Sequence, residues 1–164
     1  MDQKKTHWGT TMRLISWNCC DAFDRKFGHL ERLHPDVAVI SEVRVECLRW
    51  AGLFERAIWI GDPGQKGLAI IPFGEWRKTL EGPKVAEKWF APLHLSNGAE
   101  TFQIVGVWLD TKTACVPTTL SALDCLESFL AAGPTILAGD FNQSVVFDAR
   151  HGEGRRFQEV LKRL

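Results

Sequence analysis

The sequence lacks several features that would place it in a specialised class of proteins. Its five cysteines form no Cys-x-x-Cys pair, no segment repeats, and no apolar run approaches the length needed to span a membrane. The 20 Lys and Arg residues balance 20 Asp and Glu residues, so the formal net charge is zero. These absences argue against a disulfide framework, a zinc site built on cysteines, a membrane partner and a nucleic-acid partner attracted by net charge. A local basic groove and a small phosphorylated substrate both remain open.

The composition fits one globular domain in a reducing compartment. The chain has 164 residues, of which 45% are hydrophobic and 24% are charged. An odd number of cysteines without a bridging pattern favours the cytoplasm. Residues 1–11 are polar and lack the apolar core of a signal peptide, so we expect a leader there and a domain over residues 12–164. The sequence carries no signal of oligomeric state.

Apolar patterning along the chain predicts an α/β fold. Apolar runs bounded by turn residues predict strands at residues 12–17, 37–40, 57–60, 67–73, 85–95, 101–109 and 135–138. Apolar residues at helical spacing predict helices at 23–33, 45–53, 120–130 and from 157 onward. We expect Asp21 to cap the first helix and Thr118 or Thr119 to cap the long one, with a loop at 143–154. Because helices alternate with strands at both ends of the chain, the order indicates a mixed sheet flanked by helices in one domain.

Polar residues follow three of the predicted strands at the point where each strand ends. These residues are Asn18, Glu42 and Asp140. The carboxyl ends of parallel strands share one edge of a sheet, and open α/β sheets place ligands there. Asp140 and Asn142 would point the same way if the chain stayed extended, whereas the alternative is a turn, in which both residue types are common. Asp110 also follows a strand but is as readily a turn residue.

A cluster of carboxylates indicates a bound cation, because like charges repel each other unless a cation lies among them. Oxygen ligands without a thiol or an imidazole favour Mg²⁺ or Mn²⁺ over zinc. Mg²⁺ typically keeps several waters and is held by one or two carboxylates together with substrate phosphate. The strand-end residues therefore predict metal-assisted phosphoester cleavage. The alternative is that they are ordinary polar residues at the ends of strands.

Four segments resemble, in the same order, segments of the endonuclease/exonuclease/phosphatase family. They are Arg-Leu-Ile-Ser-Trp-Asn at 13–18, the strand ending in Glu42, Gly-Leu-Ala-Ile at 67–70 and Gly-Asp-Phe-Asn at 139–142. That family includes pancreatic-type deoxyribonucleases, apurinic-site endonucleases, sphingomyelinases and inositol-polyphosphate phosphatases. The resemblance extends from residue 12 onwards. It implies a four-layer α/β/β/α sandwich and a phosphorylated substrate such as DNA or RNA.

The resemblance also implies a role for each matching residue. Glu42 matches the Mg²⁺ (or Mn²⁺) ligand, and Asn18 matches an asparagine that supports the metal and orients the phosphate. Asp140 matches the aspartate that positions or deprotonates the attacking water. Asn142 matches the partner that holds this aspartate and contacts the phosphate. His151 lies shortly after Asn142 in the chain, and we expect it to line the substrate site.

Three departures separate the chain from the family pattern. Family members carry a final Ser-Asp-His motif whose histidine contacts the phosphate, and no such motif follows Asn142 here. Many members place histidine or tyrosine where this chain has Trp108. Some nucleases place an acid where Cys20 stands, with Asp21 one position later. We therefore expect an incomplete four-layer sandwich, truncated at its C-terminus.

Two functions follow from these residues. The first is a metal-dependent phosphoester hydrolase, either a phosphodiesterase or nuclease or a phosphatase, acting by in-line attack of an activated water. The second is a catalytically inactive truncated remnant that serves as a binding module or has no function. Turnover of a phosphodiester separates the two, whereas metal binding does not.

Overall fold

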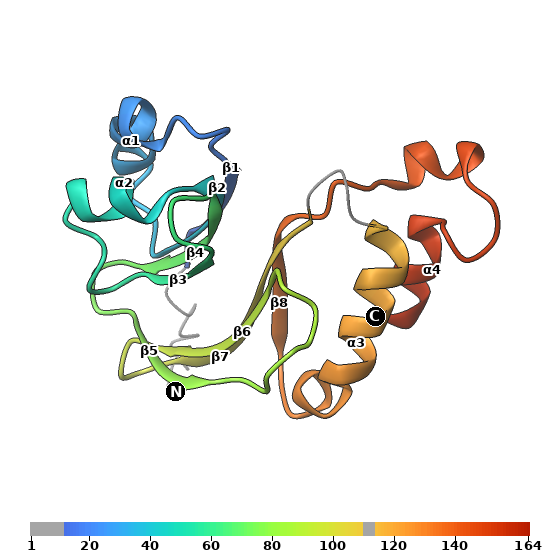
Figure 1. Cartoon of the computed structure of the whole chain (residues 1–164). Coiled ribbons are helices and arrows are strands. Elements are labelled where there is room, and N and C mark those ends of the chain that lie inside the picture. Colours follow the sequence, from blue (N-terminus) through green and yellow to red (C-terminus); the bar gives the residue numbers. More distant parts are fainter. Residues whose placement is uncertain (1–11, 110–113) are drawn as a thin grey trace, which may run out of the picture.

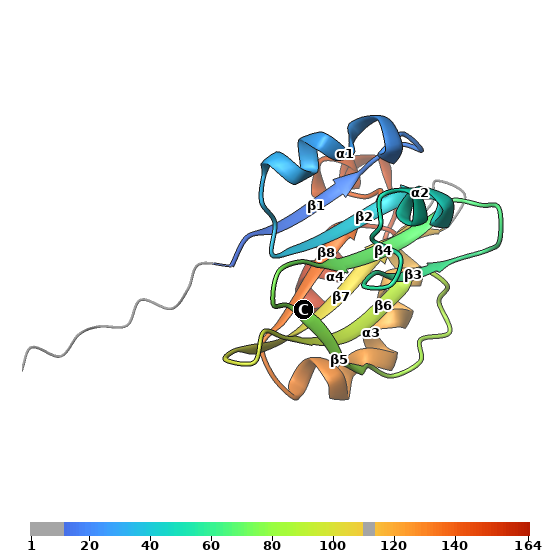
Figure 2. The same ribbon diagram turned by 90° about the vertical axis from the view of Figure 1, so that its left-hand side faces the viewer.

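Two four-stranded β-sheets pack face to face and carry helices on their outer surfaces (Figures 1 and 2). The computed structural model describes residues 12–109 and 114–164. The leader expected at residues 1–11 and Asp110 lie outside the described residues. No helix in the described part of the chain is long and apolar enough to cross a membrane.

The first sheet carries the two strands that lead to Asn18 and Glu42. Its spatial order is β1 (Leu14–Asn18), β2 (Val37–Val43), β4 (Gly67–Pro72) and β3 (Ile58–Gly61). Strands β1 and β2 run parallel, and the other pairs are antiparallel. Two helices lie on its outer face, α1 (Phe23–Arg32) and α2 (Val45–Trp50). The short crossover through α1 is the connection that parallel β1 and β2 require.

The second sheet carries the strand that leads to Asp140. Its spatial order is β5 (Arg77–Glu81), β6 (Phe90–Ser96), β7 (Thr101–Trp108) and β8 (Thr135–Asp140). Strands β7 and β8 run parallel, joined through the long helix α3 (Cys115–Ala131). Helix α4 (Phe157–Arg163) packs beside α3 on the outer face. In the chain, the 3₁₀ helix η1 (Val145–Arg150) follows β8 and precedes α4.

The main core lies between the two sheets, and each sheet has a second core under its helices. Val39 and Ile70 of the first sheet meet Leu95 and Ile104 of the second, and all four side chains are fully buried. Ile40, one residue further along β2, packs instead against α1 and α2. Successive side chains of a strand point to opposite faces, so strands buried on both faces read as continuous apolar runs. The arrangement confirms an α/β/β/α sandwich with mixed sheets flanked by helices.

Some expected elements differ from the structure for identifiable reasons. Strand β5 was not expected, because all five of its residues are exposed and its pattern lacks apolar alternation; it forms by pairing with β6. The strand expected from residue 85 begins at Phe90. The loop expected at 143–154 contains η1, in which Ser144 Oγ accepts a hydrogen bond from the backbone N–H of Val146.

The helix caps expected from the sequence were wrong. Asp21 does not cap α1, whose N-cap is Ala22, because its carboxylate pairs with Arg44 instead. The long helix begins before Thr118 and Thr119, with Ala114 as its N-cap and no side-chain capping bond. The hydroxyl of Thr119 donates to the Cys115 carbonyl inside the helix. The Asp21 side chain is thus held by a tertiary ion pair, whereas the Thr119 side chain bonds within its own helix.

Candidate active site

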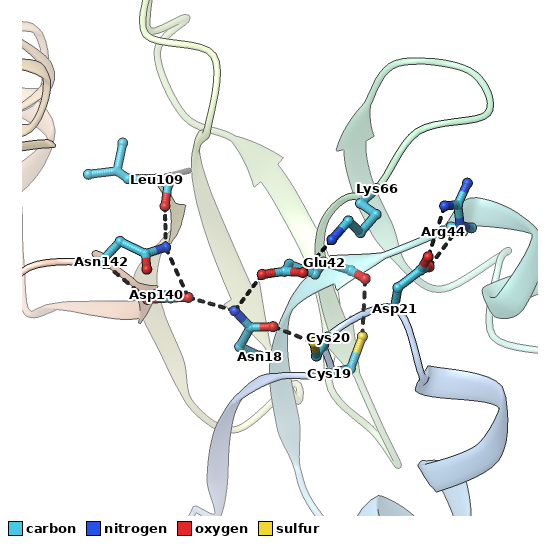
Figure 3. Close-up of polar contacts among 10 residues, drawn as sticks. All are labelled: Asn18, Cys19, Cys20, Asp21, Glu42, Arg44, Lys66, Leu109, Asp140 and Asn142. Atoms are coloured by element: carbon cyan, nitrogen blue, oxygen red, sulfur yellow. Dashed lines mark hydrogen bonds and ion pairs between the residues drawn. The ribbon is translucent and has the colours of Figure 1, made fainter. Parts of the chain in front are cut away.

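The three strand-end residues meet at one end of the sandwich, where β1 and β2 approach β8 (Figure 3). The side-chain amide of Asn18 donates to Glu42 Oε1 at 2.9 Å and to Asp140 Oδ2 at 2.7 Å. We expected these residues at one edge of a single sheet. They come instead from the carboxyl ends of strands in two facing sheets, Asn18 and Glu42 from the first and Asp140 from the second. The packing of the sheets therefore assembles the site.

A β-bulge places Glu42. The pairing of β2 with β4 shifts between Ser41 and Val43, which leaves Glu42 as the extra residue, with a φ of 60°. Positive φ is uncommon and strained for a residue with a side chain, and such strain is often found at functional sites. The Glu42 carbonyl accepts hydrogen bonds from the Asp21 N–H at 3.2 Å and from Cys19 Sγ at 3.2 Å. These bonds fix the bulge to the turn after β1.

Lys66 is a site residue that the sequence analysis missed. Its Nζ lies 2.6 Å from Glu42 Oε2, the oxygen that Asn18 leaves unbonded. Partial burial alone would raise the pKa of Glu42, but the hydrogen bonds from Lys66 and Asn18 outweigh it and hold that pKa below its ordinary value. Lys66 directly precedes β4, whose Gly67 pairs with Val43. Antiparallel pairing of β2 with β4 is the signal that could have placed Lys66 beside Glu42.

The turn after β1 orients Asn18. Its Oδ1 accepts a hydrogen bond from the Cys20 N–H at 2.9 Å, so the amide nitrogen faces the two carboxylates. Cys20 and Asp21 have φ values of 51° and 54°, which carry the chain tightly from β1 into α1. The Asp21 carboxylate receives two hydrogen bonds from Arg44, at 2.7 and 2.8 Å. This pair lowers the pKa of Asp21 and fixes the turn against α2.

The Gly-Asp-Phe-Asn segment is both a turn and part of the site. The Asn142 N–H donates to Asp140 Oδ1 at 3.0 Å, which is the bond of an Asx turn, and Asn142 has a φ of 46°. The Asn142 amide also donates to Asp140 Oδ2 at 3.2 Å and to the Leu109 carbonyl. Both oxygens of Asp140 are thereby held, and one of them reaches Asn18. The segment therefore forms the turn and not an extended strand end, and the turn itself brings Asn142 to Asp140.

Trp108 and His151 lie around this cluster. Trp108 pairs with Asp140 in the register of β7 and β8 and packs against Trp89, with ring centroids 4.6 Å apart. The buried Trp108 Nε1 has no hydrogen-bond partner among the described residues. His151 follows η1 and lines a pocket of about 370 Å³ together with Asn142. His151 is therefore beside the predicted site, on the side of Asn142.

The donor set fits a hard divalent cation better than zinc. Two carboxylates, Glu42 and Asp140, both lie within hydrogen-bonding distance of the same Asn18 nitrogen. Among the described residues, no three His, Cys, Asp or Glu side chains gather in a way that could hold a metal ion, so the protein itself offers a cation at most these two carboxylates. One or two carboxylates with water and phosphate are the usual ligands of Mg²⁺. The single charge of Lys66 offsets only one of the two carboxylates.

Solved structures with the same arrangement exist, although compared by sequence the chain matches no protein-family model and no curated protein. The endonuclease domain of TRAS1, a telomere-specific non-LTR retrotransposon, matches 93% of this chain and 70% of that chain, with a TM-score of 0.67 and 14% identity. Truncated Caenorhabditis elegans TDP2 matches 80% of this chain, with a TM-score of 0.61 and 15% identity. D. rerio TDP2 complexed with single strand DNA product matches 85%, with a TM-score of 0.58 and 14% identity.

The chain has the endonuclease/exonuclease/phosphatase fold. It spans 62% of the C. elegans TDP2 chain and 64% of the D. rerio TDP2 chain. The endonuclease/exonuclease/phosphatase fold accounts for how residues as distant in sequence as Asn18 and Asp140 come together. In this fold the ends of β1, β2 and β8 face one another across the two sheets.

Proposed function

We propose that this domain is a metal-dependent phosphoester hydrolase of the phosphodiesterase or nuclease kind. The observation that carries the proposal is the Asn18 amide bridging Glu42 and Asp140 across the two sheets. Folding alone gives no reason to bring two carboxylates to one amide at a partly exposed position, because like charges repel. A divalent cation supplies the missing positive charge and accounts for the oxygen ligands.

The residues divide the chemistry between them in this proposal. Glu42 holds Mg²⁺ or Mn²⁺, and the cation supplies positive charge that stabilises the charge developing on the phosphate oxygens. Asp140, held at both oxygens, orients a water for in-line attack and accepts its proton. Both N–H groups of the Asn18 amide and of the Asn142 amide are donated within the protein, so in this proposal each amide exchanges one of these hydrogen bonds for one to a phosphate oxygen. Asn18 supports the metal through Glu42, because its own oxygen is bonded to the Cys20 N–H.

Nucleic acid is the substrate class that we propose. D. rerio TDP2, one of the solved structures with this fold, is complexed with single strand DNA product, and the TRAS1 domain is an endonuclease domain. The neutral net charge of this chain means that substrate binding would depend on local cationic groups. We place the activity in the cytoplasm, since Cys19, Cys20, Cys47 and Cys125 carry free thiols.

Turnover tests the proposal. Bis-p-nitrophenyl phosphate and a labelled single-stranded oligonucleotide should be cleaved with Mg²⁺ or Mn²⁺ and not with EDTA. Asp140→Ala and Glu42→Ala should abolish cleavage, whereas Glu81→Ala should not, because Glu81 is an exposed carboxylate on β5. Absence of chelator-sensitive cleavage by the unmodified protein would contradict the proposal.

An inactive binding module is the alternative, and the ion pair between Lys66 and Glu42 is the observation that favours it, because this pair neutralises the Glu42 carboxylate without a cation. In that case Glu42 would still bind Mn²⁺, and cleavage would stay at the level of the Asp140→Ala variant.

A further inference from the structure

We propose that the pocket beside Asn142 binds the nucleotide unit next to the scissile phosphate, so that the preferred substrate is a single-stranded oligonucleotide rather than an isolated phosphoester. The proposal rests on the proposed function for the position of the scissile phosphate. Binding of the oligonucleotide in the pocket does not depend on turnover, so the pocket proposal and the proposed hydrolase function can fail separately.

The position of the pocket links it to the site. It has a volume of about 370 Å³, which is in the range of small-molecule sites. The start of α3, from Ala114 to Pro117, forms one wall, and the segment after β8 forms the other. Asn142 belongs to both the pocket and the site, because its side chain lines the pocket and also bonds to Asp140. A group in the pocket is therefore directly adjacent to a phosphate held at Asn18 and Asp140.

The charge of the pocket suits an anion. Arg155 and His151 line it, and no carboxylate is among those of its lining residues that the structure describes. The Arg155 guanidinium and the His151 ring make no hydrogen bond or ion pair within the described ranges. The Asp148 carboxylate in η1 accepts hydrogen bonds at both oxygens from the backbone N–H groups of Phe157 and Gln158 at the start of α4. The free guanidinium is thus available to a phosphate.

A second feature points to a ligand with hydrogen-bond donors. Gln143 lines the pocket, and its buried Oε1 has no hydrogen-bond partner among the residues described. A buried acceptor without a donor is costly, and a sugar hydroxyl or a base N–H would satisfy it. Val116 and Pro117 provide an apolar wall for the sugar or base. Phosphate, hydrogen-bond donor and apolar face together describe a nucleotide unit.

The test is binding of fluorescein-labelled dT₁₂, measured by fluorescence anisotropy in EDTA over a range of salt concentrations. Arg155→Leu should weaken binding by about tenfold at low salt and reduce the slope of log Kd against log salt by about 1, because one phosphate contact is lost. Gln143→Leu should weaken binding without changing the slope. Arg25→Leu is the matched control, because it removes an arginine from α1, far from the pocket in the fold, and should change neither.

Hydrolysis gives the second readout. Arg155→Leu should lower kcat/KM for dT₁₂ severalfold more than kcat/KM for bis-p-nitrophenyl phosphate, because only the oligonucleotide has a neighbouring phosphate. No binding of dT₁₂ by the unmodified protein, or equal affinity and slope for Arg155→Leu and Arg25→Leu, would overturn the pocket proposal. Binding that depends on Arg155 without any turnover would uphold the pocket and overturn the hydrolase. Turnover that Arg155→Leu leaves unchanged would uphold the hydrolase and overturn the pocket proposal.

Discussion

Lys66 and Glu42 form an ion pair of 2.6 Å at neighbouring ends of two antiparallel strands. The ammonium group therefore holds the same carboxylate that we assign to the divalent cation. Lys66 and a cation compete for the Glu42 oxygens, since both are attracted by the same negative charge. The pair also explains how the carboxylate is stabilised when no cation is bound.

Replacing Lys66 should therefore strengthen metal binding. We expect Lys66→Met to tighten Mn²⁺ binding by about three- to tenfold in isothermal titration calorimetry, because one competing charge is removed. Lys78→Met is the matched control, since Lys78 pairs with Glu81 and its side chain is 38% exposed, as is that of Lys66. Weaker Mn²⁺ binding by Lys66→Met would show that Lys66 orients Glu42 for the cation instead of competing with it.

Replacing the bridging amide by a carboxylate should make stability depend on metal. Asn18→Asp removes both donated hydrogen bonds and places a third carboxylate beside Glu42 and Asp140. We expect unfolding by urea in EDTA to show a loss of about 2 kcal/mol, and Mg²⁺ to restore much of it. An Asn18→Asp protein whose stability is the same in EDTA and in Mg²⁺ would contradict a cation site at this position.

Gly139 tests the local geometry before Asp140. Its φ is 141°, and a Cβ added there would lie 1.9 Å from the Val107 carbonyl oxygen, which belongs to the backbone of β7. Gly139→Ala should therefore destabilise the fold by about 3 kcal/mol or more in chemical denaturation. Gly28→Ala is the control, because a Cβ on this α1 residue meets nothing within 4 Å and should stabilise the protein by about 0.5 to 1 kcal/mol. Equal stability of the two variants would refute this account of the turn.

The Asp21 and Arg44 pair should make stability fall in acid. Arg44 holds the pKa of Asp21 below 3.8, its ordinary value. Because the pKa is lowered in the folded state, the pair contributes stability above that ordinary value and loses it as pH falls through the folded pKa. Urea midpoints measured between about pH 5 and pH 2 should therefore drop more steeply for the unmodified protein than for Asp21→Asn. Asp124→Asn, an exposed carboxylate beside Arg163, serves as the control. Parallel curves for the unmodified protein and Asp21→Asn would refute the prediction.

The buried strands and the strand-end residues could be predicted from the sequence because their signals are local. Residues 37–40 and 67–71 are continuous apolar runs, and both are strands buried on two faces. The Asn97-Gly98 turn between β6 and β7 was likewise evident, since Asn-Gly strongly favours a hairpin. The four-layer order was predicted from the resemblance of four segments, among them Gly-Asp-Phe-Asn, to the endonuclease/exonuclease/phosphatase family. The structure confirms this order.

The missed features depend on which strands pair, and a single sequence does not fix this. Lys66 reaches Glu42 only because β4 runs antiparallel to β2, and the Glu42 bulge appears only in that pairing. Strand β5 has no apolar alternation of its own and is defined by β6. We expected Asp21 to cap α1 because its position before the helix suggests a cap. Its actual partner, Arg44, lies 23 residues away, and the local sequence gives no sign of this pair. The roles of Asn18, Glu42, Asp140 and Asn142 stay predictions.

The most direct test of the central claim is a Mn²⁺ titration followed by electron paramagnetic resonance. The claim is that strand ends from two sheets build one divalent-cation site at Glu42. The unmodified protein and Glu81→Gln should each bind one ion per chain, and Glu42→Gln should bind it at least about tenfold more weakly. Equal Mn²⁺ affinity for Glu42→Gln and the unmodified protein would contradict the claim.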